Sequence, residues 1–126
     1  MDFTDQTVLV TGSSRGIGLA IAKAFDAAGA QVILHARSAI APEILAEFKQ
    51  TPQTLQFDIA DAEAAEASIK ALYKQADFPG IDVLINNAGI TKDQLAMAMT
   101  PADFAQVINV NLNGTFNVTQ PIFKKM

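Results

Sequence analysis

Short apolar runs alternate with longer amphipathic stretches along this 126-residue chain, as they do in proteins whose strands alternate with helices. The apolar runs predict strands at residues 6–11, 31–36, 54–57 and 81–85. The helical spacing of apolar positions predicts helices at residues 16–28, at residues 42–50 and from Asp61 to about residue 75. This alternation implies an α/β fold with parallel strands and right-handed crossovers.

The first predicted helix carries an apolar stripe, which we expect to pack on the sheet. The stripe consists of Ile17, Ile21, Ala24 and Phe25, and Gly29 is expected to stop the helix.

Residues 100–126 predict one long helix. Thr100 at the N-cap, Pro101 at the first helical position and Asp103 two residues later form a capping box. We expect a kink or an early end at Pro121, because proline removes a helical hydrogen bond. The apolar residues surround the helix axis, so we expect one side on the sheet and another on a second subunit. They are Phe104, Val107, Ile108, Val110, Leu112, Phe116, Val118, Ile122 and Phe123.

A glycine-rich turn, Thr11–Gly18, joins the first predicted strand to the first helix. Glycines let the backbone approach a ligand closely, and the N–H groups and dipole of the following helix attract a phosphate. The spacing Gly-x-x-x-Gly-x-Gly differs from the Gly-x-Gly-x-x-Gly of many dinucleotide-binding folds. The alternative is a turn that holds no ligand. The candidate cofactor-binding residues here are Gly12, Ser13, Ser14, Arg15 and Ile17.

The charge and composition narrow the class of partner. A formal net charge of −4 argues against nucleic acid or an anionic membrane as the main partner. The chain has no cysteine, which excludes disulfides and thiolate metal sites. The lack of cysteine weakly favours a location in the cytoplasm. We expect no bound metal. The first residues are acidic and polar, unlike a secretory signal, and no apolar run is long enough to span a bilayer.

The end of the second strand indicates which cofactor the turn prefers. A site for NAD usually places a carboxylate roughly 20 residues after the glycine turn, where it binds the ribose 2′-hydroxyl. Here the sequence reads His35-Ala36-Arg37-Ser38, without an acid. Arg37 and Arg15 could instead bind a 2′-phosphate, so NADP(H) is the predicted cofactor. The alternative is that both arginines are merely solvated.

Four motifs in order resemble the short-chain dehydrogenase/reductase family over the whole chain. They are Thr11-Gly12-x-x-x-Gly16-x-Gly18, Asp58, Asn86-Asn87-Ala88-Gly89 and Asn111. The run from Asn86 to Asp93, with Val110-Asn111-Leu112, is most similar to the 3-oxoacyl-acyl-carrier-protein reductase subgroup. Sugar and steroid dehydrogenases of the family share much of this half.

The resemblance implies a role for each motif. Asp58 would bind the adenine amino group, with Ile59 lining the ring; Asp58 alone would more often be a solvated loop acid or a helix cap. Asn87, Ala88 and Gly89 would lie beneath the ribose and nicotinamide. Asn111 would complete a proton relay by holding a water. Two further expectations come from position: Asn86 ties its strand to its neighbours through amide hydrogen bonds, and His35 lies at a strand end near the cofactor rim.

The resemblance also implies that residues 1–126 are the N-terminal half of a Rossmann-type doubly wound parallel sheet, with strand order 3-2-1-4 and the later strands missing. The family's catalytic Ser and its Tyr-x-x-x-Lys segment would follow residue 126. The apolar edge of residues 81–85 would then be exposed, and these 126 residues alone would be inactive.

The complete protein is expected to reduce a 3-oxoacyl thioester, on acyl carrier protein or another carrier, with NADPH in fatty-acid synthesis. It would be a homo-oligomer through the helix of residues 100–126. The alternatives are a non-catalytic nucleotide-binding or assembly module, or a dehydrogenase of a sugar or steroid alcohol.

Overall fold

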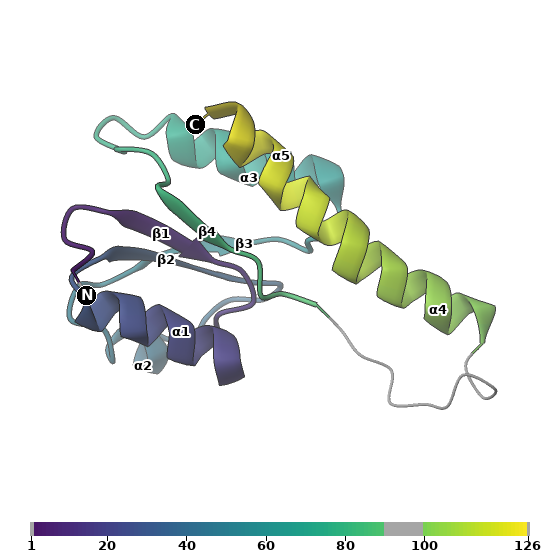
Figure 1. Cartoon of the computed structure of the whole chain (residues 1–126), viewed down its shortest axis with the longest axis horizontal. Helices are drawn as coiled ribbons and strands as arrows, with labels where there is room; N and C mark the ends of the chain where they lie inside the picture. The colour runs from purple at the N-terminus through teal and green to yellow at the C-terminus, as the bar shows by residue number, and fades with distance from the viewer. Residues whose placement is uncertain (1, 90–99, 126) are drawn as a thin grey trace.

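The computed structural model describes residues 2–89 and 100–125, in which four parallel strands form one sheet in the order β3-β2-β1-β4 (Figure 1). The predicted order is confirmed. Val10 at the end of β1 lies beside Leu34 of β2 and Ile85 of β4. β4 is therefore an edge strand, and no described strand pairs with its outer side. The strands are β1 (Thr7–Val10), β2 (Gln31–Ala36), β3 (Gln53–Gln56) and β4 (Val83–Ile85).

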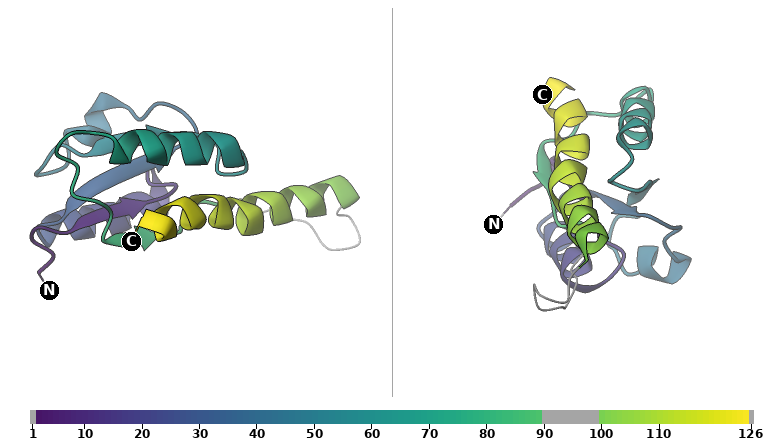
Figure 2. Two further views of the ribbon diagram at one scale, coloured as in Figure 1. Left: turned by 90° about the horizontal axis from the view of Figure 1, so that it is seen from above. Right: turned by 90° about the vertical axis from the view of Figure 1, so that its right-hand side faces the viewer.

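Helices cover both faces of the sheet (Figures 1 and 2). Helices α1 (Gly16–Ala27) and α2 (Pro42–Leu45) pack on one face, where Val8 and Val10 point. Helices α3 (Ala62–Tyr73) and α5 (Gly114–Lys125) pack on the other, where Leu9 points. Alternate residues of β1 thus enter two different cores, which explains why Val8, Leu9 and Val10 are all apolar.

Helix α1 turns a different face to the sheet from the predicted one. Its buried residues are Gly18, Ala22 and Asp26, whereas Ile17 is 75% exposed and Ala24 is also exposed. Ile21 and Phe25 are half-buried against the core, as expected. The predicted burial of Ile17 and Ala24 is therefore wrong. The helix approaches the preceding turn through Gly18, where a Cβ would lie 2.1 Å from the Gly12 carbonyl oxygen.

Helix α2 ends at Leu45, five residues before its predicted end. The buried carboxylate of Asp26 on α1 accepts the main-chain N–H of Lys49 at 2.8 Å and that of Gln50 at 3.3 Å. These N–H groups are therefore bound by a side chain instead of by helical carbonyls, and the predicted helix over residues 42–50 is too long.

Strand β4 begins at Val83, two residues later than predicted. The N–H of Ile81 donates to the Tyr73 hydroxyl at 3.1 Å, so it binds the end of α3 and not a neighbouring strand. The Asp82 carboxylate and main chain bind the two main-chain groups of Thr7, which fixes where β4 starts beside β1.

The C-terminal helix contains an interruption that the apolar pattern did not predict. Helix α4 (Pro101–Ile108) begins with the predicted capping box, in which the Thr100 hydroxyl accepts from the Asp103 N–H at 3.0 Å. A π-helical segment, η1 (Asn109–Asn113), then leads into α5. A π segment inserts extra backbone into a helix and often occurs at functional sites.

Helix α5 continues through Pro121 to Lys125, so the predicted early end is wrong. Val118 and Ile122 are buried against α3 and the sheet. A proline inside a helix costs about 3 kcal/mol, and burying a residue such as Ile122 recovers about 1.5–3 kcal/mol. Tertiary packing therefore supports the helix beyond its proline.

Candidate cofactor site

A cavity of about 370 Å³ opens at the carboxyl ends of the parallel strands. Open α/β sheets bind ligands at this edge, so the cavity is the candidate cofactor site. Its walls bring together residues that lie far apart in the sequence. The predicted residues that line it are Gly12, Ser14, Arg15, Arg37, Asp58, Ile59, Asn87, Ala88 and Gly89. Gly16, His35, Ala36 and Val110 also line it.

The glycine turn and the loop after β4 are held against each other by side chains. The Thr11 hydroxyl oxygen accepts the main-chain N–H groups of Asn87 and Ala88, both at 3.0 Å. The Asn87 side-chain amide in turn donates to the Gly12 carbonyl at 3.0 Å. The side chains of Thr11 and Asn87 thus hold the glycine turn and the loop after β4 together beside the cavity.

Two glycines give the turn its shape. Gly12 and Gly16 both have φ +61°, a conformation that residues with a Cβ rarely adopt. A Cβ on Gly18 would lie 2.1 Å from the Gly12 carbonyl oxygen, so only glycine permits this approach of α1 to the turn. The spacing of the three glycines therefore follows from the backbone geometry of the turn.

The N-terminus of α1 has the character of an anion site. Helices α3 and α4 have capping side chains, Asp61 and Thr100, that accept their first N–H groups. Helix α1 has no such side-chain cap at Arg15 and no acidic residue in its first turn. Uncapped N–H groups beside a cavity are suited to a phosphate, which would supply the acceptor that the chain does not.

Charged side chains around the cavity are mostly positive. Arg15 and Arg37 line it and are exposed, as two cations that can meet a phosphate. Asp58 is the acid in its wall, and its carboxylate accepts the Ala60 N–H at 2.9 Å. The residue that caps α3 is Asp61 and not Asp58. Asp58 lines the cavity instead.

Two of the residues predicted for cofactor binding, and the predicted catalytic residue Asn111, are not among the residues that line the cavity. The side chain of Ser13 is completely buried, and its hydroxyl oxygen accepts the main-chain N–H of His35 at 2.9 Å. Ile17 extends from the first turn of α1 and is largely exposed. For Ser13, the structure indicates that the side chain joins the turn to β2.

His35 is buried in the wall of the cavity and connects three segments. Its Nδ1 accepts the Gly12 N–H at 3.1 Å, and its Nε2 lies 2.9 Å from the Phe57 carbonyl oxygen. Burial lowers the pKa of the imidazole, although the Phe57 carbonyl and the Asp58 charge act in the opposite direction. One sign of this role is visible in the sequence, where His35 is a single polar residue between the apolar Leu34 and Ala36.

Asn111 lies in the C-terminal helical region, and Asn86 contacts that region. Asn111 is in η1, close enough to Gly89 that a Cβ there would lie 2.6 Å from Oδ1 of Asn111. The Asn111 carbonyl accepts the Thr115 hydroxyl at 2.8 Å. The Asn86 side-chain amide donates to the Thr119 hydroxyl at 3.1 Å and so ties β4 to α5, which is the structural role predicted for it. Residues 90–93 of the motif lie outside the described residues.

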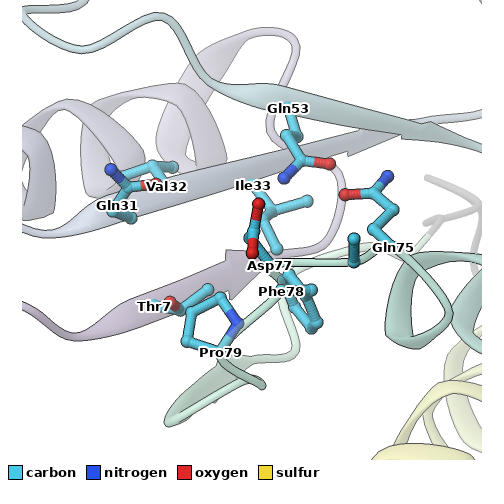
Figure 3. A pocket seen from close by; sticks show the side chains of 10 residues that line it. Thr7, Gln31, Val32, Ile33, Gln53, Gln75, Asp77, Phe78 and Pro79 are labelled. Atoms are coloured by element: carbon cyan, nitrogen blue, oxygen red, sulfur yellow. The ribbon is translucent and has the colours of Figure 1, made fainter.

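A second cavity, of about 320 Å³, lies at the opposite end of the sheet (Figure 3). Thr7, Gln31 and Gln53, which begin β1, β2 and β3, line it together with residues that follow α3. None of the residues predicted for cofactor binding lies there. The chemistry of the motifs is therefore gathered at the carboxyl ends alone.

The parts of the chain that the structure describes contain no cluster of three or more potential metal-ligating side chains. None of their helices is long and apolar enough to cross a membrane.

Comparison with known proteins supplies the family. Residues 6–126 match the family model described as short chain dehydrogenase. The chain belongs to the short chain dehydrogenase family. This is a family of oxidoreductases that bind a nicotinamide cofactor, in agreement with the resemblance and the position of the cavity.

Similar proteins differ in the reaction their names state. The chain is 41% identical to 3-oxoacyl-acyl-carrier-protein reductase of Aquifex aeolicus over 94% of its own length and 49% of the relative's. It is 42% identical to acetoacetyl-CoA reductase of Shinella zoogloeoides, over 96% and 49% of the two lengths. The chain thus spans about half the length of the curated relatives it matches.

A solved structure shares the fold closely. Gluconate 5-dehydrogenase of Burkholderia cenocepacia, in complex with NADP and tartrate, matches 98% of this chain and 49% of its own. The TM-score is 0.88 and the sequence identity 32%. The sheet order and the helix layers of the chain are therefore those of Rossmann-like short chain dehydrogenases.

Proposed function

We propose that this chain forms the NADP(H)-binding half of an enzyme that reduces a 3-oxoacyl thioester to the 3-hydroxyacyl form. The observation that carries the proposal is the cavity at the carboxyl ends, where an uncapped helix N-terminus and two arginines surround one opening. The similarity to reductases of 3-oxoacyl and acetoacetyl thioesters supports the substrate class.

The residues of the cavity fit a dinucleotide phosphate. The N–H groups at the start of α1 would bind the pyrophosphate, and the space beside Gly16 is open, with no atom within 4 Å of a Cβ placed there. Arg15 and Arg37 would bind a 2′-phosphate. Asp58 and Ile59 would hold the adenine, and Asn87, Ala88 and Gly89 would lie beneath the ribose and nicotinamide.

The bound NADPH would supply a hydride to the carbonyl carbon of the 3-oxoacyl group. The carbonyl oxygen takes up one proton, so that the ketone becomes a secondary alcohol. In this half of the enzyme, Asn111 is the residue proposed to hold a water for that proton transfer. The family's Ser, Tyr and Lys are expected in the part of the protein that follows, so we propose that these 126 residues alone do not turn over substrate.

The substrate can be tested with the complete polypeptide that its gene encodes. We expect NADPH to be oxidised with an acetoacetyl thioester, and little NADP⁺ to be reduced with gluconate. A preference for gluconate would instead favour the sugar dehydrogenase alternative, which the similarity to gluconate 5-dehydrogenase supports. Cofactor binding without turnover of either substrate would favour a non-catalytic nucleotide-binding or assembly module.

We also propose that the complete protein is a homo-oligomer through the helix of residues 100–126. Helix α5 buries Gly114, Val118 and Ile122. Large apolar side chains on α4, η1 and α5 remain exposed in the described part of the chain: Ile108, Leu112, Phe116 and Phe123. A second copy would cover them with the same apolar surface.

A further inference from the structure

His35 is the one histidine of the sequence, and neither the family motifs nor the proposed reaction gives it a role. It lies at the end of β2, is 1% exposed, and is one of the residues that line the cofactor cavity. Its ring lies 4.4 Å from that of Phe57, centre to centre. A buried histidine can be a satisfied core residue, so its hydrogen bonds decide what it does.

The two ring nitrogens have opposite roles. A main-chain N–H can only donate, so Nδ1 must carry the lone pair that receives the Gly12 N–H. The Phe57 carbonyl can only accept, so Nε2 must carry the proton that it receives. The neutral Nε2–H tautomer satisfies both bonds, and no other protonation state does.

The bond to Gly12 acts on the phosphate-binding turn itself. Gly12 has φ +61° and lines the cavity, and its carbonyl is already bound by Asn87. Its N–H is directed toward the imidazole of His35, which accepts it. Ser13, the next residue, pairs through its main chain and hydroxyl with the main chain of His35.

We propose that His35 is the positioning residue that holds the glycine turn in its phosphate-binding conformation, and that its protonation releases the turn and weakens cofactor binding. This rests on the proposed cofactor site. With a proton on Nδ1, the ring would place an N–H donor against the Gly12 N–H donor, and the hydrogen bond would be lost.

The charges that face the imidazole come from three segments. Arg15 in the turn and Arg37 after β2 line the same cavity as the imidazole, and Asp58 after β3 favours its protonation. Burial opposes protonation most strongly and keeps the pKa below the ordinary value for histidine. The imidazole is therefore neutral at neutral pH, and the turn is released only under acidic conditions.

Two variants separate the two hydrogen bonds of His35. In His35→Asn the side-chain oxygen can take the place of Nδ1 and accept the Gly12 N–H, without a group that titrates. In His35→Gln the side-chain amide nitrogen can take the place of Nε2 and donate to the Phe57 carbonyl. The pair therefore tests the Gly12 contact against a merely structural contact with Phe57.

The dissociation constants of NADP⁺ and NAD⁺ are measured by calorimetry for the complete polypeptide and both variants. At about pH 8 we expect His35→Asn to bind within about twofold of the wild type and His35→Gln to bind about tenfold more weakly. Toward about pH 5 the wild type should lose about fivefold to tenfold relative to His35→Asn. The loss should occur with both cofactors, because NAD⁺ has no 2′-phosphate whose own titration could produce it.

Equal affinities of the two variants would overturn the proposal, as would a wild-type pH profile that His35→Asn reproduces. Tighter binding of the wild type in acid would also overturn it, because His35 would then act as a phosphate-binding cation. If the wild type binds neither dinucleotide, the proposed function fails.

In that case the ligand-free protein still decides the role of His35. Hydrogen exchange of the Gly12 N–H, corrected for its intrinsic rate, should accelerate on acidification in the wild type and not in His35→Asn. Equal protection in both proteins would refute the role.

Discussion

The hydroxyl oxygen of Thr11 accepts the main-chain N–H of Asn87 at 3.0 Å, although 76 positions separate the two residues. The same oxygen accepts the N–H of Ala88. One buried hydroxyl thus joins the turn after β1 to the loop after β4. Residues of both loops line the cofactor cavity, so its shape depends on this contact.

Thr11→Val should reduce both stability and cofactor affinity. The substitution keeps the shape of the side chain but leaves two main-chain N–H groups without their acceptor. We expect a loss of about 3 kcal/mol in the free energy of unfolding, measured by urea denaturation. Thr11→Ser keeps the hydroxyl and should lose only about 1 kcal/mol. A loss in Thr11→Val that is no larger than the loss in Thr11→Ser would contradict the expected importance of the two hydrogen bonds.

Gly18→Ala and Gly16→Ala should differ because of what surrounds each glycine. The Cβ introduced by Gly18→Ala would lie 2.1 Å from the Gly12 carbonyl oxygen, and relief of that clash would move the turn or α1. We expect a loss of stability of about 3 kcal/mol and of most cofactor binding. The Cβ introduced by Gly16→Ala would have no neighbouring atom within 4 Å. Its cost is therefore the backbone strain at φ +61°, about 1 kcal/mol. Thermal unfolding of both variants, with and without NADP⁺, measures the difference.

The stability of the complete protein should fall in mild acid partly because of His35. Its pKa is lowered in the folded state, so the unfolded chain takes up the proton first as the pH falls below the ordinary histidine value. The contribution of neutral His35 to the free energy of unfolding is fully present above the ordinary histidine pKa. It is lost as the pH falls through the lowered pKa of the folded state, at up to about 1.4 kcal/mol per pH unit. Urea denaturation of the wild type and His35→Asn should show a steeper pH dependence for the wild type. Parallel curves would contradict this assignment.

Arg37→Ala should reduce discrimination between the two cofactors. A guanidinium bound to a 2′-phosphate contributes about 1.5–3 kcal/mol, so NADPH should bind about 10-fold to 100-fold more weakly while NADH changes little. Lys74→Ala removes the same charge at the end of α3, away from the cavity, and serves as the control. Equal weakening of both cofactors by Arg37→Ala would mean that Arg37 does not read the 2′-phosphate.

Phe116→Glu should dissociate the proposed oligomer of the complete protein. Phe116 is 58% exposed, and a carboxylate there would have to be buried in the interface without a partner. We expect the dissociation constant from sedimentation to rise about a hundredfold or more. Gln106→Glu adds the same charge at an exposed position of α4 and should have little effect. An unchanged assembly in Phe116→Glu would remove this helix from the interface.

The candidate site was largely predictable because its residues carry local signals. Glycine spacing, an arginine after a strand and the Asn-Asn-Ala-Gly run each lie at a strand end, and parallel strands bring those ends to one edge. Ser13 and Ile17 shared the same turn in the sequence, but neither lines the cavity. Which residues of a turn face the ligand depends on its φ and ψ angles, and these were not visible in the pattern.

The sequence by itself determined that four strands alternate with helices, because apolar periodicity is a local property of the chain. Local motifs indicated the chemistry at the strand ends, whereas the strand order followed only from the resemblance of those motifs to the short-chain dehydrogenase family. Only the tertiary structure decided which face of α1 is buried, where α2 and β4 begin or end, and that Thr11, His35 and Asn87 connect distant segments. Those outcomes depend on hydrogen bonds between segments far apart in sequence, such as Asp26 to Lys49. A residue forms such bonds only after the sheet has brought its partner close.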